Sequence, residues 1–343
     1  MDQNTSSTKV ADVEPTRPTG KESFIVMSGV KARPPEWLWE QRIPLGELTL
    51  IDGDPATNKS SLTLDIAARV SIGGEMPDKT KGVKGGVLLL TAEDSITKTL
   101  PYRLEAAGAN MERIVVFKEP MSIPKDLQIL EDTACRFNAR LLVIDPLMFF
   151  LEGNANGDQS VRKALTPLKR LAERANMAVL LVRHLNKSGG KLALYRGGGS
   201  IAITGIARSG FLIGNHPEDR NLRVMCHYKS NLGLLTKSML FEPVSADNAL
   251  AIEWRGECDL TADDLLARGN KRGQMLERAK NFLHERLQDG PVSQKEIKEA
   301  ATNNGIAYKT LERAKDAIGV ESHRKGFGPN SFTYWCLPKK DEA

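Results

Sequence analysis

The chain has 343 residues, of which 41% are hydrophobic and 27% are charged, and its formal net charge is +5. This length accommodates one α/β domain of ordinary size with a small second domain, and the composition is ordinary for a soluble globular protein. No apolar run reaches the roughly 18 residues that a membrane helix needs, which argues against a membrane protein. The four cysteines lie far apart without a CxxC pair, so neither a zinc site nor a disulfide framework is predicted.

Residues 1–22 are polar and contain no apolar stretch of the kind that a signal peptide requires. We therefore expect a disordered tail there and a cytoplasmic protein. An α/β core is expected over residues 23–260, a polar linker over 261–273 and a second small domain over 274–343.

A phosphate-binding loop is predicted where an apolar strand runs into the sequence GDPATNKS. The pattern GxxxxGK[S/T] surrounds phosphates with backbone N–H groups, places a Lys on the β- and γ-phosphates and offers a hydroxyl to Mg²⁺. A Gly/Pro turn with a chance Lys-Ser pair is the alternative, but a strand before the loop and a helical pattern after it favour ATP. The residues expected to bind ATP are Gly53, Asp54, Pro55, Ala56, Thr57, Asn58, Lys59, Ser60 and Ser61.

Asn58 stands where the pattern has its second glycine. That position needs a backbone that tolerates a positive φ, and Asn is the commonest residue after Gly to adopt one. The substitution weakens the match to the pattern without breaking it.

Short apolar runs alternate with helical stretches after the loop. Near-continuous Val, Ile and Leu runs indicate strands buried on both faces, as in a mostly parallel sheet flanked by helices. The predicted strands cover residues 49–51, 87–94, 114–117, 141–145, 178–184, 210–214 and 223–229.

Carboxylates follow two of these runs. Asp145 ends the run LLVID, so it is expected to hold Mg²⁺ together with Ser60, although a turn residue before a proline would look the same. Glu93 and Asp94 follow VLLLTA, so one of them can point into the same crevice.

Two basic regions are candidate DNA contacts. The glycine-rich stretch after residue 185 carries Lys187, Lys191, Tyr195 and Arg196, and it is either a solvated connection or a loop that binds phosphates and stacks a base. The C-terminal order of three helices and a hairpin predicts a winged helix-turn-helix, with Lys309 and Arg313 on the third helix. Such modules bind DNA or dock on proteins.

Six sequence motifs, taken in their order along the chain, are typical of one known protein family. They are IPLGELTLIDGDPATNKSSLTLDIAARV, VLLLTAEDS, LLVIDPL, LLVRHLNKS, GGGSIAITGIARS and HYKSNLG. Over about residues 35–255 the chain resembles the RecA-type ATPases of the RepA-like plasmid helicase group, which occur on plasmids, phages and other mobile elements. The resemblance implies that Glu93 activates water and that His184 senses the γ-phosphate, where position alone would equally allow a core histidine. It further implies that Arg208 is an arginine finger and Lys229 a second cation for a neighbouring subunit's ATP, in a ring that is most often a hexamer.

The resulting expectation is an ATP- and Mg²⁺-dependent ring ATPase that acts on single-stranded DNA as a RepA-like replicative helicase. The alternative is an ATP-switched DNA-binding or loading factor that does not unwind DNA. A small-molecule kinase is disfavoured because the sequence shows no lid or acceptor site.

Overall fold

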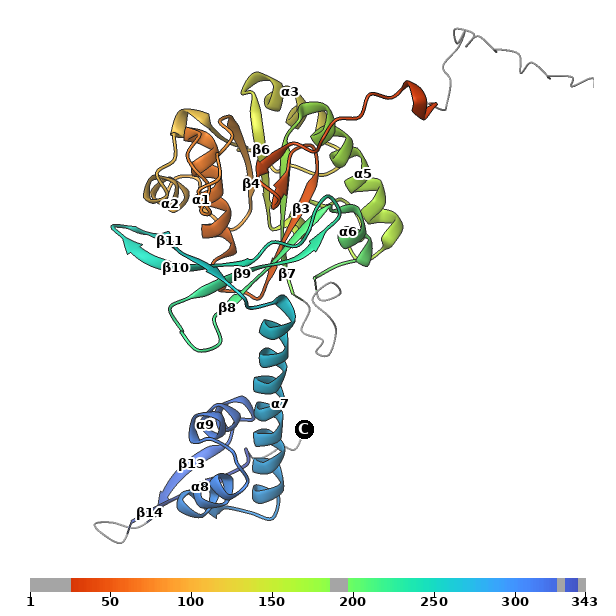
Figure 1. Cartoon of the computed structure of the whole chain (residues 1–343). Helices are drawn as coiled ribbons and strands as arrows, with labels where there is room; N and C mark the ends of the chain where they lie inside the picture. Colours follow the sequence, from red (N-terminus) through yellow and green to blue (C-terminus); the bar gives the residue numbers. More distant parts are fainter. Residues whose placement is uncertain (1–25, 186–196, 326–330, 339–343) are drawn as a thin grey trace, which may run out of the picture. The chain divides into compact units, whose positions relative to one another are not determined.

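The computed structural model of the chain describes residues 26–185, 197–325 and 331–338 (Figure 1). The expected tail over residues 1–22 lies outside this range. Residues 1–35 and 36–343 form separate compact units, and the described part of the first contains one short 3-10 helix, η1 (Met27–Gly29).

A nine-stranded sheet forms the centre of the second unit, with strand order β11-β10-β9-β8-β3-β7-β6-β4-β5. Six strands run parallel: β3 (Leu48–Gly53), β4 (Gly86–Thr91), β5 (Ile114–Val116), β6 (Ala139–Asp145), β7 (Ala178–His184) and β8 (Ser209–Asn215). Three antiparallel strands extend it: β9 (Arg223–Ser230), β10 (Ser238–Ala246) and β11 (Ala249–Cys258). The predicted mostly parallel α/β fold is confirmed, while β10 and β11 were not anticipated.

Helices cover both faces of this sheet (Figure 1). One face packs on α3 (Leu127–Arg136), α4 (Leu147–Phe150), α5 (Asp158–Ala175) and α6 (Ile201–Ile206). The other packs on α1 (Lys59–Ile72), α2 (Leu100–Ala106), β1 (Trp37–Trp39) and β2 (Ile43–Pro44), and the short helix η2 (Met111–Arg113) precedes β5. Because successive strand residues face opposite sides, Leu50 belongs to the first core and Ile51 to the second.

Residues 262–273 are helical and follow the N-cap Thr261, where the sequence indicated a polar linker. They form the first half of α7 (Ala262–Leu287), a helix of 26 residues. The Thr261 hydroxyl accepts the backbone N–H of Asp264, whose carboxylate in turn accepts the Thr261 N–H, and this capping box starts the helix. Ala262 and Leu266 then pack on β8 and β9, so the beginning of α7 belongs to the core of the sheet.

The C-terminal region has its own small core. It comprises the end of α7, α8 (Gln294–Asn303), α9 (Tyr308–Ala317) and a three-stranded antiparallel sheet of β12 (Val292–Ser293), β13 (Glu321–Lys325) and β14 (Phe332–Cys336). Leu283, Ile297, Leu311 and Trp335, each at most 1% exposed, join these elements. Within the described part of the chain, no helix is long and apolar enough to cross a membrane.

Candidate nucleotide-binding site

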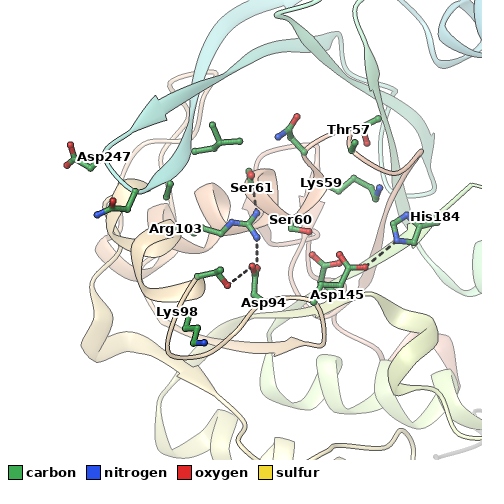
Figure 2. A pocket seen from close by; sticks show the side chains of 17 residues that line it. Thr57, Lys59, Ser60, Ser61, Asp94, Lys98, Arg103, Asp145, His184 and Asp247 are labelled. Carbon is green, nitrogen blue, oxygen red and sulfur yellow. Dashed lines mark hydrogen bonds and ion pairs between the residues drawn. The ribbon is translucent and has the colours of Figure 1, made fainter.

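Four predicted site segments meet at one edge of the sheet. The carboxyl ends of parallel strands lie at the same edge, and the register places Gly53 of β3 beside His184 of β7 and Thr91 of β4 beside Asp145 of β6. A cavity of about 660 Å³ opens there (Figure 2). Its lining includes Ala56 to Ser61 of the loop together with Glu93, Asp145 and His184, so the structure brings these sequence candidates together.

The loop between β3 and α1 has the backbone that a phosphate-binding loop requires. A Cβ on Gly53 would lie 2.5 Å from the carbonyl oxygen of Ile213, so only glycine fits at the start of the loop. Asn58 adopts a left-handed conformation with φ 64° and ψ 29°, as expected for the residue that replaces glycine. Its side-chain oxygen accepts a hydrogen bond from Arg223 Nε at 3.2 Å. Ala56 also has a positive φ of 62°, which the sequence did not indicate.

Lys59 is the first residue of α1 and points along the loop (Figure 2). Its Nζ donates to the carbonyl oxygen of Asp54 at 2.8 Å. Burial lowers the pKa of Lys59, and the charges of Asp145 and Glu93 oppose this effect. A buried ammonium at a helix N-terminus is well placed to receive an anionic phosphate.

Ser60 and Asp145 present oxygen atoms side by side. Asp145 is 7% exposed, and the Ser60 hydroxyl hydrogen-bonds to it. Burial raises the pKa of Asp145, the Ser60 bond lowers it, and the charge of Glu93 raises it further. Carboxylate and hydroxyl oxygens are ligands that Mg²⁺ accepts, and a divalent cation would favour the ionised carboxylate, so these residues fit a magnesium ion.

Glu93 and Asp94 have different surroundings, which separates the two carboxylates that the sequence left open. Asp94 accepts a short hydrogen bond from Arg103 Nη1 and another from Thr99 Oγ1 at 3.1 Å. Glu93 is exposed, lines the cavity, and its Oε1 lies 3.6 Å from His184 Nε2. Glu93 is therefore the carboxylate that is available to a water molecule or substrate.

His184 ends β7 and reaches the cavity from the side opposite Arg103 (Figure 2). Its Nε2 faces Glu93, while its Nδ1 is buried and has no hydrogen-bond partner among the described residues. An unpartnered buried ring nitrogen is unfavourable unless a ligand or water supplies its partner.

The cavity also contains residues that sequence reasoning missed. Arg103 of α2 donates from Nη2 to Ser61 Oγ at 3.0 Å, in addition to its bond with Asp94. Lys98 and Thr99 lie beside it, and the tip of the β10–β11 hairpin contributes residues 247–250. Nothing in the local sequence marks Arg103, but the alternation of Leu250, Ile252 and Trp254 with smaller or charged residues could have indicated β11.

Arg208 and Lys229 do not line this cavity. Arg208 lies just before β8 with a side chain that is 41% exposed, and its Nε is 3.9 Å from Glu47. Lys229 lies near the end of β9, where burial and the charge of Arg208 lower its pKa. The two cations are therefore close to each other but outside the chain's own nucleotide site.

The predicted DNA contacts are only partly within the described structure. Lys187, Lys191, Tyr195 and Arg196 lie outside the described residues. Lys309 and Arg313 are both exposed on α9.

Comparison with known proteins supports an ATPase core. Residues 16–190, just over half of the chain, match the protein family AAA_25, described as "AAA domain". Proteins named DNA repair protein RadA from Listeria monocytogenes, Bacillus subtilis and Aquifex aeolicus are 27%, 26% and 28% identical to it over 150, 148 and 148 residues. Each match covers 42% of this chain but only 29%, 29% and 30% of those proteins, so the chain spans less than a third of these relatives.

Proposed function

The chain belongs to the AAA domain family of P-loop ATPases, and from this premise we propose that it hydrolyses ATP in response to DNA. The observation that carries the proposal is the meeting of the loop, Asp145, Glu93 and His184 around one cavity at the carboxyl edge of the sheet. In a parallel α/β sheet this edge is where ligands bind.

The residues divide the work of phosphoryl transfer among them. The loop amides and Lys59 bind the β- and γ-phosphates, while Ser60 and Asp145 would hold Mg²⁺, which would neutralise phosphate charge. Glu93 accepts a proton from water as the water oxygen attacks the γ-phosphorus and the bond to the β-phosphate oxygen breaks. His184, which lines the cavity, contacts the γ-phosphate and so reports its presence.

The site is completed by a neighbouring copy of the chain. Arg208 and Lys229 are adjacent cations that do not line their own cavity, and Arg208 Nε lies 3.9 Å from a Glu47 carboxylate oxygen. In a head-to-tail ring, the same two cations enter the next subunit's cavity and stabilise charge at the γ-phosphate. We propose a ring, with six subunits as the leading number by resemblance.

DNA is the proposed polymer on which this ATPase acts. The named relatives are DNA repair proteins, and the basic residues Lys187, Lys191 and Arg196 with Tyr195 follow the strand that carries His184. The exposed cations Lys309 and Arg313 on α9 suit a winged helix that contacts the DNA backbone or a replication protein. We therefore propose that the protein is a RepA-like replicative helicase of a mobile element, since such a helicase would use all of these features.

The alternative, an ATP-switched DNA-binding or loading factor, is supported by the loop itself. Asn58 occupies the left-handed position, and Arg223 of β9 holds its side chain. A loop restrained in this way suits a long-lived ATP-bound state better than rapid turnover.

Phosphate release measured with and without single-stranded DNA tests the proposal. We expect DNA to increase turnover several-fold in the wild type and the Lys59→Ala variant to release no phosphate under either condition. An equal rate with and without DNA would contradict the proposal. A forked substrate then separates the candidates, because the helicase displaces a strand with ATP and the loading factor displaces none.

A further inference from the structure

A buried ionic cluster lies directly behind the nucleotide site. Arg183 of β7 and Asp52 of β3 are each 1% exposed, and the guanidinium donates from Nε and Nη2 to the two carboxylate oxygens, each at 2.8 Å. The hydroxyl of Tyr228 on β9 donates to Asp52 Oδ2 at 2.6 Å. The cluster thus joins three strands of the central sheet.

Each member of the cluster precedes a residue of the proposed ATP site in the sequence. Asp52 precedes Gly53, Arg183 precedes His184, and Tyr228 precedes Lys229. Adjacent residues of a strand face opposite sides of the sheet, so the cluster faces α6 while His184 lines the cavity. Any shift of these strand ends that the γ-phosphate causes must also move the cluster.

Arg183 also holds the chain segment that follows the basic stretch predicted to contact DNA. Its Nη1 donates to the carbonyl oxygen of Gly198 at 3.4 Å, and its Nη2 donates to Thr204 Oγ1 at 3.2 Å. In addition, the Gly198 N–H donates to the carbonyl oxygen of His184 at 2.7 Å. The segment from Gly197 to Thr204 is therefore attached to the end of the sensor strand by backbone and side chain.

Two glycines provide the space that the cluster needs. A Cβ on Gly197 would lie 2.2 Å from Arg183 Nη2, and a Cβ on Gly210 of β8 would lie 2.8 Å from the ring of Tyr228. Tyr228 can cross β8 to reach Asp52 because residue 210 has no side chain. Local packing is thus adapted to the ionic cluster at two separate positions.

Stability alone does not account for a charged cluster at this place. Burial would lower the pKa of Arg183, but the interactions with Asp52 and Tyr228 together outweigh this effect and raise it, so the pair stays ionised. Apolar residues of similar size often stabilise a core as well as a buried ion pair does, whereas the fork of an arginine fixes several partners in one geometry. Such a fixed set of bonds suits a residue that positions neighbouring segments relative to each other.

We propose that Arg183 is a positioning residue that couples the nucleotide site to DNA through the segment Gly197–Thr204. This inference rests on the proposed function, because it concerns how ATP and DNA influence each other at the same site. ATP at His184 and DNA beside Gly197 are then linked through one guanidinium, and each ligand changes the affinity for the other by the same factor.

The test measures the affinity for single-stranded DNA with and without a non-hydrolysable ATP analogue. We expect the analogue to tighten DNA binding by about tenfold in the wild type, within the usual range of coupling between sites. Arg183→Lys keeps the positive charge but loses the planar guanidinium that bonds several partners. In this variant the analogue should therefore change the DNA affinity by less than about twofold. Its affinity for the analogue alone should stay within about threefold of the wild type.

One milder variant and one matched control exclude a general loss of folding. Tyr228→Phe removes a single hydroxyl, so it should reduce the coupling while analogue binding is kept. Arg42→Lys is the control, because Arg42 is 2% exposed and bonds Asp78 and Thr236 outside the cavity. It should retain the full coupling.

The outcomes distinguish a failure of the positioning role of Arg183 from a failure of the proposed function. Wild-type coupling in both Arg183→Lys and Tyr228→Phe would overturn the positioning role and leave the proposed function intact. An equal loss in Arg42→Lys would also overturn it, since the loss would then follow from destabilisation. A wild type that binds neither the analogue nor DNA would refute the proposed function itself, and the inference with it.

Discussion

The replacement of glycine by Asn58 gives a prediction whose magnitude follows from the structure. Asn58 has φ 64°, and its side chain accepts one hydrogen bond from Arg223. Alanine in this conformation costs roughly 1–2 kcal/mol, and the lost bond to a guanidinium costs on the order of 1 kcal/mol more. We therefore expect Asn58→Ala to lower the free energy of unfolding by about 2–3 kcal/mol.

Asn58→Gly separates the two contributions. Glycine loses the bond to Arg223 and adds backbone freedom in the unfolded state, but it has no steric cost at positive φ. Its free energy of unfolding should therefore fall by only about 1–2 kcal/mol, which is about 1 kcal/mol less than for alanine. ATP affinity should stay within about threefold of the wild type, because glycine allows the same loop backbone.

Urea unfolding followed by tryptophan fluorescence gives these free energies, and a fluorescent ATP analogue gives the affinities. Arg223→Ala removes the other partner of the hydrogen bond. In this variant, Asn58→Gly should therefore destabilise the protein less than it does in the wild type. A glycine variant less stable than the alanine variant would refute the assignment of a strained left-handed backbone at Asn58. If the losses of unfolding free energy in Asn58→Gly and Arg223→Ala simply added up in the double variant, the hydrogen bond would not contribute to stability.

Three further predictions concern other parts of the chain. Burial, with the charge of Arg42, lowers the pKa of His227 from 6.5 to about 4, so as the pH falls from 6.5 toward 4 the unfolded chain binds a proton that the native chain does not. The free energy of unfolding should fall across that window by up to about 3 kcal/mol. Urea midpoints at pH 7 and pH 4.5 should show a smaller loss of stability for His227→Asn than for the wild type. An equal loss in the two proteins would contradict this prediction. Lys59→Ala and Arg208→Ala should each be inactive alone, whereas an equal mixture should recover about one quarter of wild-type turnover in reassembled rings, and no recovery would contradict a shared site. Lys309→Ala with Arg313→Ala should weaken DNA binding and reduce the slope of log affinity against log salt by about 2, while an unchanged slope would remove α9 from the DNA contacts.

The sequence was sufficient for the parts of the site that lie at strand ends. Glu93, Asp145 and His184 each stand at the end of an apolar run, and parallel strands place their carboxyl ends at one edge, so the proximity of these residues could be inferred without coordinates. The choice between Glu93 and Asp94 required the structure, because it depends on Arg103 from another element.

Contacts between distant elements could not be inferred in this way. The ionic cluster joins Asp52, Arg183 and Tyr228 across three strands, and each of these residues in isolation resembles an ordinary strand residue. The hairpin of β10 and β11 contributes residues 247–250 to the cavity, although these residues lie far along the chain from the loop. The stretch beginning at Thr261 was expected to be a linker because of its polarity and glycines, although its capping pair was present in the sequence.

Single-turnover hydrolysis by Glu93→Gln tests the proposed role of Glu93 as the residue that activates water at this cavity. We predict that Glu93→Gln binds ATP within about threefold of the wild type but hydrolyses it at least about 100-fold more slowly, as expected for loss of a general base. The neighbouring Asp94→Asn, whose carboxylate is engaged by Arg103 and Thr99, should lose less than about tenfold. Near wild-type hydrolysis by Glu93→Gln, or a larger loss in Asp94→Asn, would contradict the account.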